Sequence, residues 1–273
     1  MMRALWTAAS GMTTQQTNVD VIANNLSNVN TTGYKTQTAQ FKTLLYQTIQ
    51  SKTTSANGET KPIGAQVGLG VRNASITTNF RQGPLTSTDI NTDFAIDGKA
   101  FFALQNLDGE TVYTRNGSFN WAIGSEDGGV MLCSSEGFPV LDTNGMTIEL
   151  GPEYNTSMIS IDADGNVCYP DENNNPQPIG MQIGLIQFSN PGGLEKSSGS
   201  TYKMTNASGE PIMEIEDPML QKSKIKQGYL ESSNVQTVDE MVNLIVAQRA
   251  YEMNSKAIQA ADDMLGQANQ LRR

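Results

Sequence analysis

The sequence predicts an α+β protein in which N- and C-terminal helices form an inner coiled-coil-like domain. The middle of the chain is predicted to form an antiparallel β domain with an extended polar arm. Three observations lead to this prediction. Residues 1–30 and 237–273 carry apolar side chains at helical spacing, residues from about 80 to 230 alternate in short segments between turn residues, and residues 47–67 are polar with neither period.

The first thirty residues have the pattern of a helix with one apolar seam. Leu5, Met12, Val19 and Leu26 lie seven residues apart, and Ile22 fills an intermediate position. Such a helix cannot bury its seam alone, and no second helical segment follows it directly in the sequence. We therefore expect its partner to come from the other end of the chain and from neighbouring subunits.

This helical pattern ends in an asparagine-rich turn. Asn24, Asn25 and Asn28 have short amides that can bond local backbone or a neighbouring subunit, and asparagine tolerates left-handed conformations. We expect Gly33 to complete the turn and Tyr34 to begin the outward path of the chain. A plain helix stop, without contacts to other subunits, stays open as the alternative for each asparagine.

A second helix is predicted to begin at Thr237, which has Glu240 three residues later in the spacing of a capping box. Val238, Met241 and Ile245 widen its apolar face beyond what one antiparallel helix covers. We therefore expect the end helices to become ordered in a bundle that neighbouring subunits complete, as in a ring or a helical filament. The apolar positions that recur every three or four residues are Val242, Val246, Ala250, Met253, Ala257 and Met264.

The middle of the chain has the signals of strands joined by tight turns. Alternating segments favour strands at residues 94–96, 100–104, 111–115, 118–121, 130–133, 159–161, 167–169 and 181–188. The turn pairs suited to hairpins with positive φ are Asp108-Gly109, Asn116-Gly117, Asn144-Gly145 and Asp164-Gly165. The predicted divisions are residues 1–30 for the first helix, 31–79 for linker and arm, 80–228 for the β domain and 229–273 for the second helix.

The composition argues against several classes of function. A formal net charge of -10 disfavours binding to nucleic acid or to anionic lipid. The chain has no histidine, and Cys133 and Cys168 lack the spacing of a metal site, so we expect no metal, no cofactor and no enzymatic activity. No segment has the length of a membrane span, and the N-terminal apolar patch is too interrupted for a cleavable signal, so membrane insertion is not expected.

Several motifs then resemble one family. The segment ANNLSNVNTTGYK, residues 23–35, is similar to the A-N-N-L-A-N-x-x-T-x-G-[FY]-K signature of the bacterial flagellar axial proteins of the rod and hook, with Ser27 in place of the more frequent alanine. Residues 227–265 resemble the C-terminal helix of that family. The segments FAIDGKAFFAL, YTRNGSFN and FSNPGGLEKSSGSTY resemble its central motifs, so the resemblance covers nearly the whole chain.

The resemblance implies a structural subunit that polymerises in many copies into a helical tube, which acts as a drive shaft for motor torque and encloses the export channel. It implies export by the flagellar type III apparatus and contacts with other rod and hook proteins and with ring or bushing proteins. It places the subunit in the basal body outside the cytoplasmic membrane, in the periplasm or cell wall zone.

Within the family, the chain length and the polar arm at residues 46–70 favour the distal part of the rod, and the resemblance associates this arm with packing between subunits in a straight, stiff rod. A hook subunit or another rod subunit is the alternative. From a different class, a secreted adhesin with a β domain also stays open.

Overall fold

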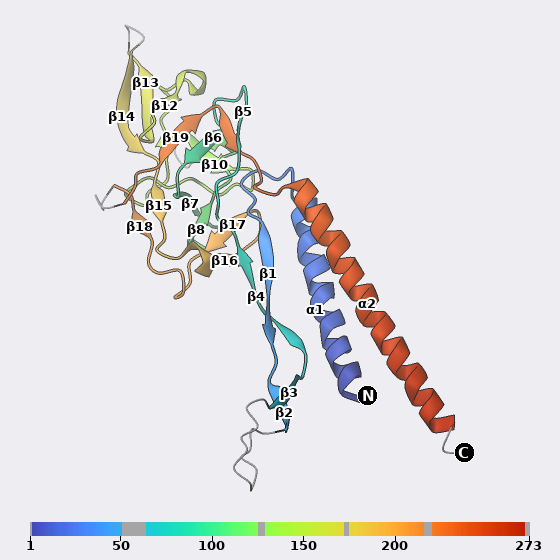
Figure 1. The fold of residues 1–273 in the computed structure, drawn as a ribbon. Coiled ribbons are helices and arrows are strands. Elements are labelled where there is room, and N and C mark those ends of the chain that lie inside the picture. The colour runs from blue at the N-terminus through green and yellow to red at the C-terminus, as the bar shows by residue number, and fades with distance from the viewer. Residues whose placement is uncertain (1, 51–63, 125–128, 172–174, 216–219, 271–273) are drawn as a thin grey trace. The chain divides into compact units, whose positions relative to one another are not determined.

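The computed structural model describes residues 2–50, 64–124, 129–171, 175–215 and 220–270 (Figure 1). Contacts within the chain group it into two compact units. The helical unit comprises residues 1–27, 37–78 and 236–273, and the β unit comprises residues 28–36 and 79–235. The domain boundaries expected from the sequence stay a prediction beside this grouping.

The helical unit is built from two long helices and a narrow β ribbon. Helices α1 (Met2–Ser27) and α2 (Thr237–Gln270) lie side by side and run in opposite directions (Figure 1). Strands β1 (Gln37–Thr43) and β4 (Val71–Thr78) pair antiparallel and pack on α1. Small side chains at buried positions, including Ala8, Ala247 and Ala261, allow the helix backbones to approach closely.

The described part of the expected arm continues this ribbon. Strand β2 (Tyr46–Gln50) pairs antiparallel with β3 (Ala65–Gly68). Leu45, Tyr46 and Ile49 are exposed. Residues 51–63 of the expected arm lie outside the described residues, so its role stays a prediction.

The β unit contains short antiparallel strands in several small sheets. The largest sheet has six strands in the order β16-β17-β8-β7-β15-β18, and two three-stranded sheets have the orders β11-β10-β9 and β12-β13-β14. Strands β19 and β20 pair with β6 and β5. The bounds are β5 (Leu85–Ser87), β6 (Phe94–Asp97), β7 (Phe101–Gln105), β8 (Thr111–Thr114), β9 (Phe119–Ile123), β10 (Val130–Ser134), β11 (Glu149–Leu150), β12 (Ser160–Ile161), β13 (Asn166–Pro170), β14 (Pro176–Gln182), β15 (Leu185–Gln187), β16 (Glu195–Lys196), β17 (Thr201–Lys203), β18 (Ile212–Met213), β19 (Lys224–Gln227) and β20 (Tyr229–Glu231).

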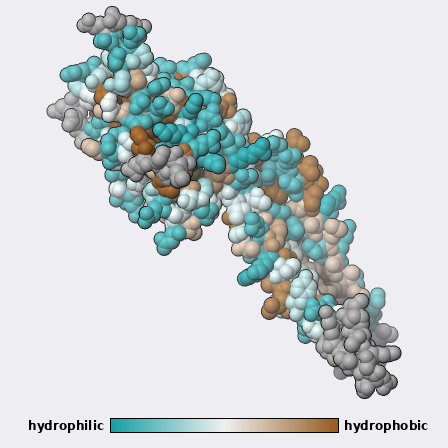
Figure 2. All heavy atoms as spheres, turned by 60° about the vertical axis from the view of Figure 1, so that its left-hand side comes forward, coloured by the Kyte–Doolittle hydropathy of each residue, from teal (hydrophilic) through white to brown (hydrophobic). Residues whose placement is uncertain are grey.

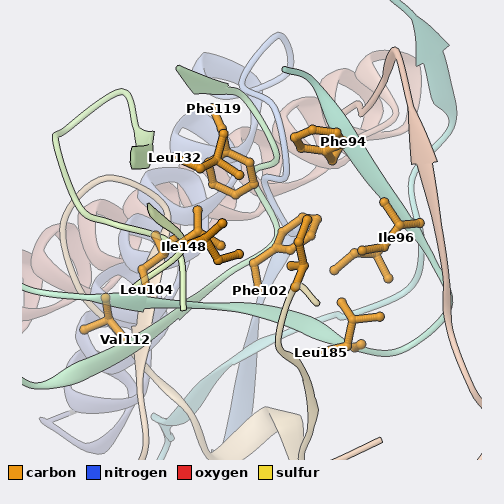
Figure 3. Close-up of a cluster of buried hydrophobic side chains, with 13 residues drawn as sticks. Phe94, Ile96, Phe102, Leu104, Val112, Phe119, Leu132, Ile148 and Leu185 are labelled. Carbon is orange, nitrogen blue, oxygen red and sulfur yellow. The ribbon is translucent and has the colours of Figure 1, made fainter. Parts of the chain in front are cut away.

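The core of the β unit gathers aromatic and aliphatic side chains from several strands. Phe94 of β6, Phe102 and Leu104 of β7, and Phe119 of β9 point toward one another and are almost fully buried (Figure 3). The Phe102 and Phe119 rings meet edge to face with their centroids 5.2 Å apart. Each such side chain contributes about 1.5–3 kcal/mol when it is removed from water. Helices at both ends of the chain and this central antiparallel region confirm the predicted α+β class.

Each strand predicted from alternation overlaps an observed strand, and the structure corrects two details. The expected strand at residues 181–188 divides between β14 and β15 at Gly184, where an added Cβ would lie 3.0 Å from the carbonyl oxygens of Leu141 and Asp142. The Asn116-Gly117 pair does not close a hairpin, because β8 pairs with β7 and β17 while β9 pairs with β10. Glycine is required at position 117 because a Cβ there would lie 1.6 Å from the Phe94 carbonyl oxygen.

Candidate assembly site

Helix α2 is apolar on two opposite sides, and α1 covers one of them. Along this covered side, Asn254 packs against Gly11 of α1, and the Glu240 carboxylate accepts a hydrogen bond of 3.3 Å from Asn25 Nδ2. Glu240, predicted from its spacing to form a capping box, therefore contacts α1. The other buried or half-buried apolar positions of this side are Leu244, Ala247, Ile258, Ala261 and Leu265.

The opposite side of α2 carries a row of exposed apolar side chains, which we call the outer row. Hydrophobic side chains are visible at the surface of the helical unit in Figure 2. Exposed apolar side chains that gather on one side of a helix mark a surface that binds another protein segment. The outer row comprises Val238 (71% exposed), Met241 (56%), Val242 (53%), Ile245 (57%), Val246 (63%), Met253 (65%) and Met264 (51%).

The apolar positions predicted for α2 therefore fall mainly on its uncovered side. Val242, Val246, Met253 and Met264 belong to the outer row, Ala257 is exposed and Ala250 is half-buried.

The predicted seam of α1 is covered much more completely than the outer row. Leu5, Met12, Val19 and Leu26 are half-buried, and Ile22 is 5% exposed. This helix packs against both α2 and the β1–β4 ribbon.

Asn25 ties three segments of the helical unit together. Its Nδ2 donates to the Gln37 carbonyl oxygen at 2.8 Å, and its Oδ1 accepts from the Gln37 backbone N–H at 3.0 Å. The same Nδ2 lies 3.3 Å from the Glu240 carboxylate, so one side chain joins the end of α1 to the starts of β1 and α2. Asn25 is 1% exposed.

The two neighbouring asparagines of the motif also make hydrogen bonds. Asn24 is exposed, and its Nδ2 donates to the Gln37 side chain at 3.4 Å. Asn28 Oδ1 accepts from the Thr31 hydroxyl at 3.1 Å, and its carbonyl oxygen accepts from the Thr31 backbone N–H. Asn28 thus shapes the turn after α1, as expected for a short amide at a helix end.

Replacing Asn25 with alanine is expected to lower the free energy of unfolding by about 1–3 kcal/mol, because two partly buried backbone groups of Gln37 lose their hydrogen bonds to the buried amide. Asn24→Ala provides the matched control and should cost less than about 0.5 kcal/mol, since that amide is exposed. Urea unfolding followed by circular dichroism measures both. Equal losses for the two variants would contradict the role assigned to Asn25.

Gly33 and Tyr34 are held firmly in the β unit. Gly33 has a φ of +68°, and its N–H donates to the Glu231 carbonyl oxygen at 2.7 Å. An added Cβ would lie 2.7 Å from the Asn116 nitrogen and 2.8 Å from the Arg115 carbonyl carbon. Tyr34 is 3% exposed, and Lys196 Nζ lies 4.1 Å from the centre of its ring.

Replacing Gly33 with alanine should therefore destabilise the protein by about 2–5 kcal/mol, the sum of left-handed backbone strain and overpacking. Gly109→Ala separates the two causes, because Gly109 has a φ of +80° and its Cβ would meet nothing within 4 Å. That control should lose only about 1–2 kcal/mol. Thermal unfolding of both variants checks the difference, and a Gly33→Ala loss no larger than that of the control would rule out the steric contribution.

A buried ionic network in the β unit was not found from the sequence. Lys35 Nζ lies 2.6 Å from Glu231 Oε1, and Arg115 Nη1 lies 3.2 Å from Glu231 Oε2, with all three side chains at most 2% exposed. Burial lowers the pKa of the Lys35 ammonium group although Glu231 opposes this effect, and burial also lowers the pKa of Arg115.

Further hydrogen bonds hold this network in place. Lys35 Nζ donates to the Arg81 carbonyl oxygen at 3.0 Å, and Arg115 donates to the Gly98 carbonyl oxygen at 2.7 Å. The Gly83 N–H donates to Glu231 Oε1 at 2.8 Å. Lys35 and Glu231 both lie in motifs quoted above, but no local pattern pairs residues 196 positions apart.

The described residues contain no group of three or more histidine, cysteine, aspartate or glutamate side chains that could hold a metal ion. Cys133 and Cys168 are buried, and burial raises the pKa of both thiols. Within the described parts of the chain, neither helix combines the length and apolarity needed to cross a membrane.

Three protein families match separate parts of the chain. The family described as "Flagella basal body rod protein" matches residues 5–35, "Flagellar hook protein FlgE/F/G D1 domain" matches residues 95–169, and "Flagellar basal body rod FlgEFG protein C-terminal" matches residues 226–271. These ranges include most of α1 with the turn after it, much of the β unit, and α2.

Full-length relatives agree with these matches. The flagellar basal-body rod protein FlgG of Borreliella burgdorferi is 46% identical over 100% of both chains, and that of Caulobacter vibrioides is 43% identical over 99% of this chain and 100% of the relative. FlgG of Bacillus subtilis is 37% identical over 100% of both chains. Similarity at this level over complete chains shows that the protein belongs to the flagellar basal-body rod protein family.

Proposed function

We propose that the protein is a structural subunit of the distal rod of the bacterial flagellar basal body and that it polymerises into a helical tube. The observation that carries this proposal is the outer row of α2. This row is exposed while α1 covers the opposite side of the same helix.

The two apolar sides of α2 supply a physical reason for polymerisation. The side facing α1 is buried inside one chain. The outer row is removed from water only when helices from other copies cover it. Burial of one outer-row side chain contributes about 1.5–3 kcal/mol, so several in one contact favour association strongly. Repetition of this head-to-tail contact generates a helical filament with a coiled-coil-like inner layer of end helices.

The self-assembly residues expected from the sequence divide into two roles under this proposal. Val242, Val246, Ala257, Met253 and Met264 contact neighbouring copies directly. The remaining residues position α1 and the turn that follows it, and they are Leu5, Met12, Val19, Ile22, Asn24, Asn25, Leu26, Asn28, Gly33, Tyr34 and Ala250.

In the proposed assembly, the tube transmits motor torque and encloses the channel through which later subunits travel. The flagellar type III apparatus exports the subunits, which assemble outside the cytoplasmic membrane in the periplasm or cell wall zone. Other rod and hook proteins adjoin the tube, and ring or bushing proteins surround it. The extended arm, whose described part is the β2–β3 pair, packs between subunits and stiffens the tube. The proposed role of the protein requires no catalysis.

Electron microscopy of concentrated purified protein tests the proposal. Straight, stiff tubes are the expected result. Curved, supple polymers would favour a hook-type subunit of the same family. A folded monomer that does not associate at any accessible concentration would overturn the proposal and favour a secreted β-domain protein.

A further inference from the structure

The two units differ sharply in charge. The β unit contains nine lysines and arginines against 21 aspartates and glutamates, a formal net charge of -12, whereas the helical unit contains nine against seven, a net charge of +2. These counts add to the net charge of -10 for the whole chain. Surface contacts between identical β units are therefore repulsive unless complementary regions meet.

Five of the nine cationic residues in the β unit gather in one region, which we call the basic patch. Lys224 and Lys226 are exposed on either side of Ile225, which is 3% exposed, so the alternation of strand β19 directs both lysines toward solvent. Lys226 Nζ lies 2.8 Å from Asp97 Oδ2 on the paired strand β6. The basic patch comprises Arg81, Lys99, Lys222, Lys224 and Lys226.

A hollow of about 360 Å³ is lined by three members of the basic patch. Arg81, Asp97, Lys99 and Lys222 are among the residues that line it, so three cations and one carboxylate face this space. Arg81 is anchored there because its carbonyl oxygen accepts hydrogen bonds from Lys35 and Asn234. The hollow therefore presents an excess of positive charge and has room for carboxylate side chains.

The acidic surface of another copy of the protein is the partner whose charge is complementary to the basic patch. The β unit outside the basic patch has four cationic residues against 20 acidic ones, with Asp97 counted in the patch region. Lys35 and Arg115 among these four, and Asp93, Glu214 and Glu231 among the 20, are buried and contribute little to the surface. One chain therefore carries both a basic patch and a strongly acidic remainder.

Such a surface is complementary to itself only when different regions of two copies meet. This is a heterologous contact, which repeats head-to-tail and builds helical filaments. We propose that the basic patch binds the acidic surface of the β unit of an adjacent copy and sets the lateral register of neighbouring subunits. This inference rests on the proposed function, because it needs copies that are held side by side in a polymer.

Charge reversal in the full chain tests this inference. Lys222→Glu is expected to raise the critical concentration for assembly at least tenfold at low salt, because it places a carboxylate against an acidic neighbour. The matched control is Lys203→Glu, which causes the same change in net charge in the β unit at a lysine outside the patch that is paired with Glu110. This control should stay within about twofold of the unmodified protein.

Sedimentation of polymers across a protein concentration series, at low salt and at high salt, gives the readout. The difference between Lys222→Glu and the unmodified protein should shrink at about 1 M salt, where charges are screened beyond about 3 Å. Circular dichroism and urea unfolding establish that both variants fold.

Each outcome has a definite meaning. Equal shifts for the two variants would show that only net charge matters, and no shift for Lys222→Glu would show that the patch lies outside the contacts between copies; either result overturns the inference while leaving the proposed function intact. Failure of the unmodified protein to assemble would overturn both.

Discussion

Replacing Glu231 with glutamine lowers the free energy of unfolding by about 3–5 kcal/mol, the largest stability effect expected in this protein. The side chain keeps its size, but two buried cations lose the anion that both contact. Lys35 and Arg115 are at most 2% exposed, so neither can regain hydration without moving the backbone that surrounds it. Denaturant unfolding of the purified variant measures the loss.

Glu110→Gln is the control for this change. Glu110 also forms an ion pair, with Lys203 at 2.8 Å, but both side chains are well exposed. Exposed pairs contribute little because water solvates each partner when the other is removed. A loss for Glu231→Gln as small as the loss for Glu110→Gln would show that the buried network is not needed to hold residues 28–36 in the β unit.

Replacing Met253 with aspartate is expected to weaken assembly strongly while the single chain stays folded. Met253 is 65% exposed, so the substitution leaves the packing of α2 on α1 unchanged. In a polymer the same position is covered by a neighbouring copy, where a lone carboxylate loses its hydration. A cost of about 3 kcal/mol corresponds to a rise of roughly 100-fold in the critical concentration.

Gln259→Asp controls for charge on the same helix, because Gln259 is exposed and polar and lies about 120° around the helix from Met253. Sedimentation and electron microscopy measure assembly, and circular dichroism measures the helix content of both variants. Normal tubes from Met253→Asp would contradict the assignment of the outer row to contacts between copies. A loss of helix in that variant would instead assign Met253 to the fold of the single chain.

The sequence predicted some features of the asparagine-rich segment, residues 23–35, and missed others. Asparagines at the end of α1 and glycine at a left-handed turn are dictated by backbone chemistry within a few residues, and Asn28 and Gly33 agree with this expectation. The role of Asn25 is not confined to the local turn, because its amide forms hydrogen bonds with residues of β1 and α2. Only the folded chain shows that role, since Glu240 is 215 positions away in the sequence.

The apolar pattern of α2 shows that periodicity alone does not predict which apolar side of the helix packs inside the chain. Apolar residues on both sides of the helix produce overlapping repeats, and the repeat predicted from the sequence contains Val242, Val246 and Met253. The side that packs inside the chain contains Ala247 and Ala261, which are the most buried apolar residues of α2, together with Leu244, Ile258 and Leu265. Hydrophobicity alone therefore identifies an apolar side without stating which partner covers it.

The sequence by itself determined the class of fold, the positions of the end helices and central strands, and the family, because these depend on periodicity and on motifs read along the chain. The tertiary structure decided that Asn116-Gly117 is a close backbone approach, that Lys35, Arg115 and Glu231 share one buried site, and that the outer row of α2 stays exposed. The physical reason is that local propensity acts over a few residues, whereas ion pairing and burial depend on segments that meet only after folding.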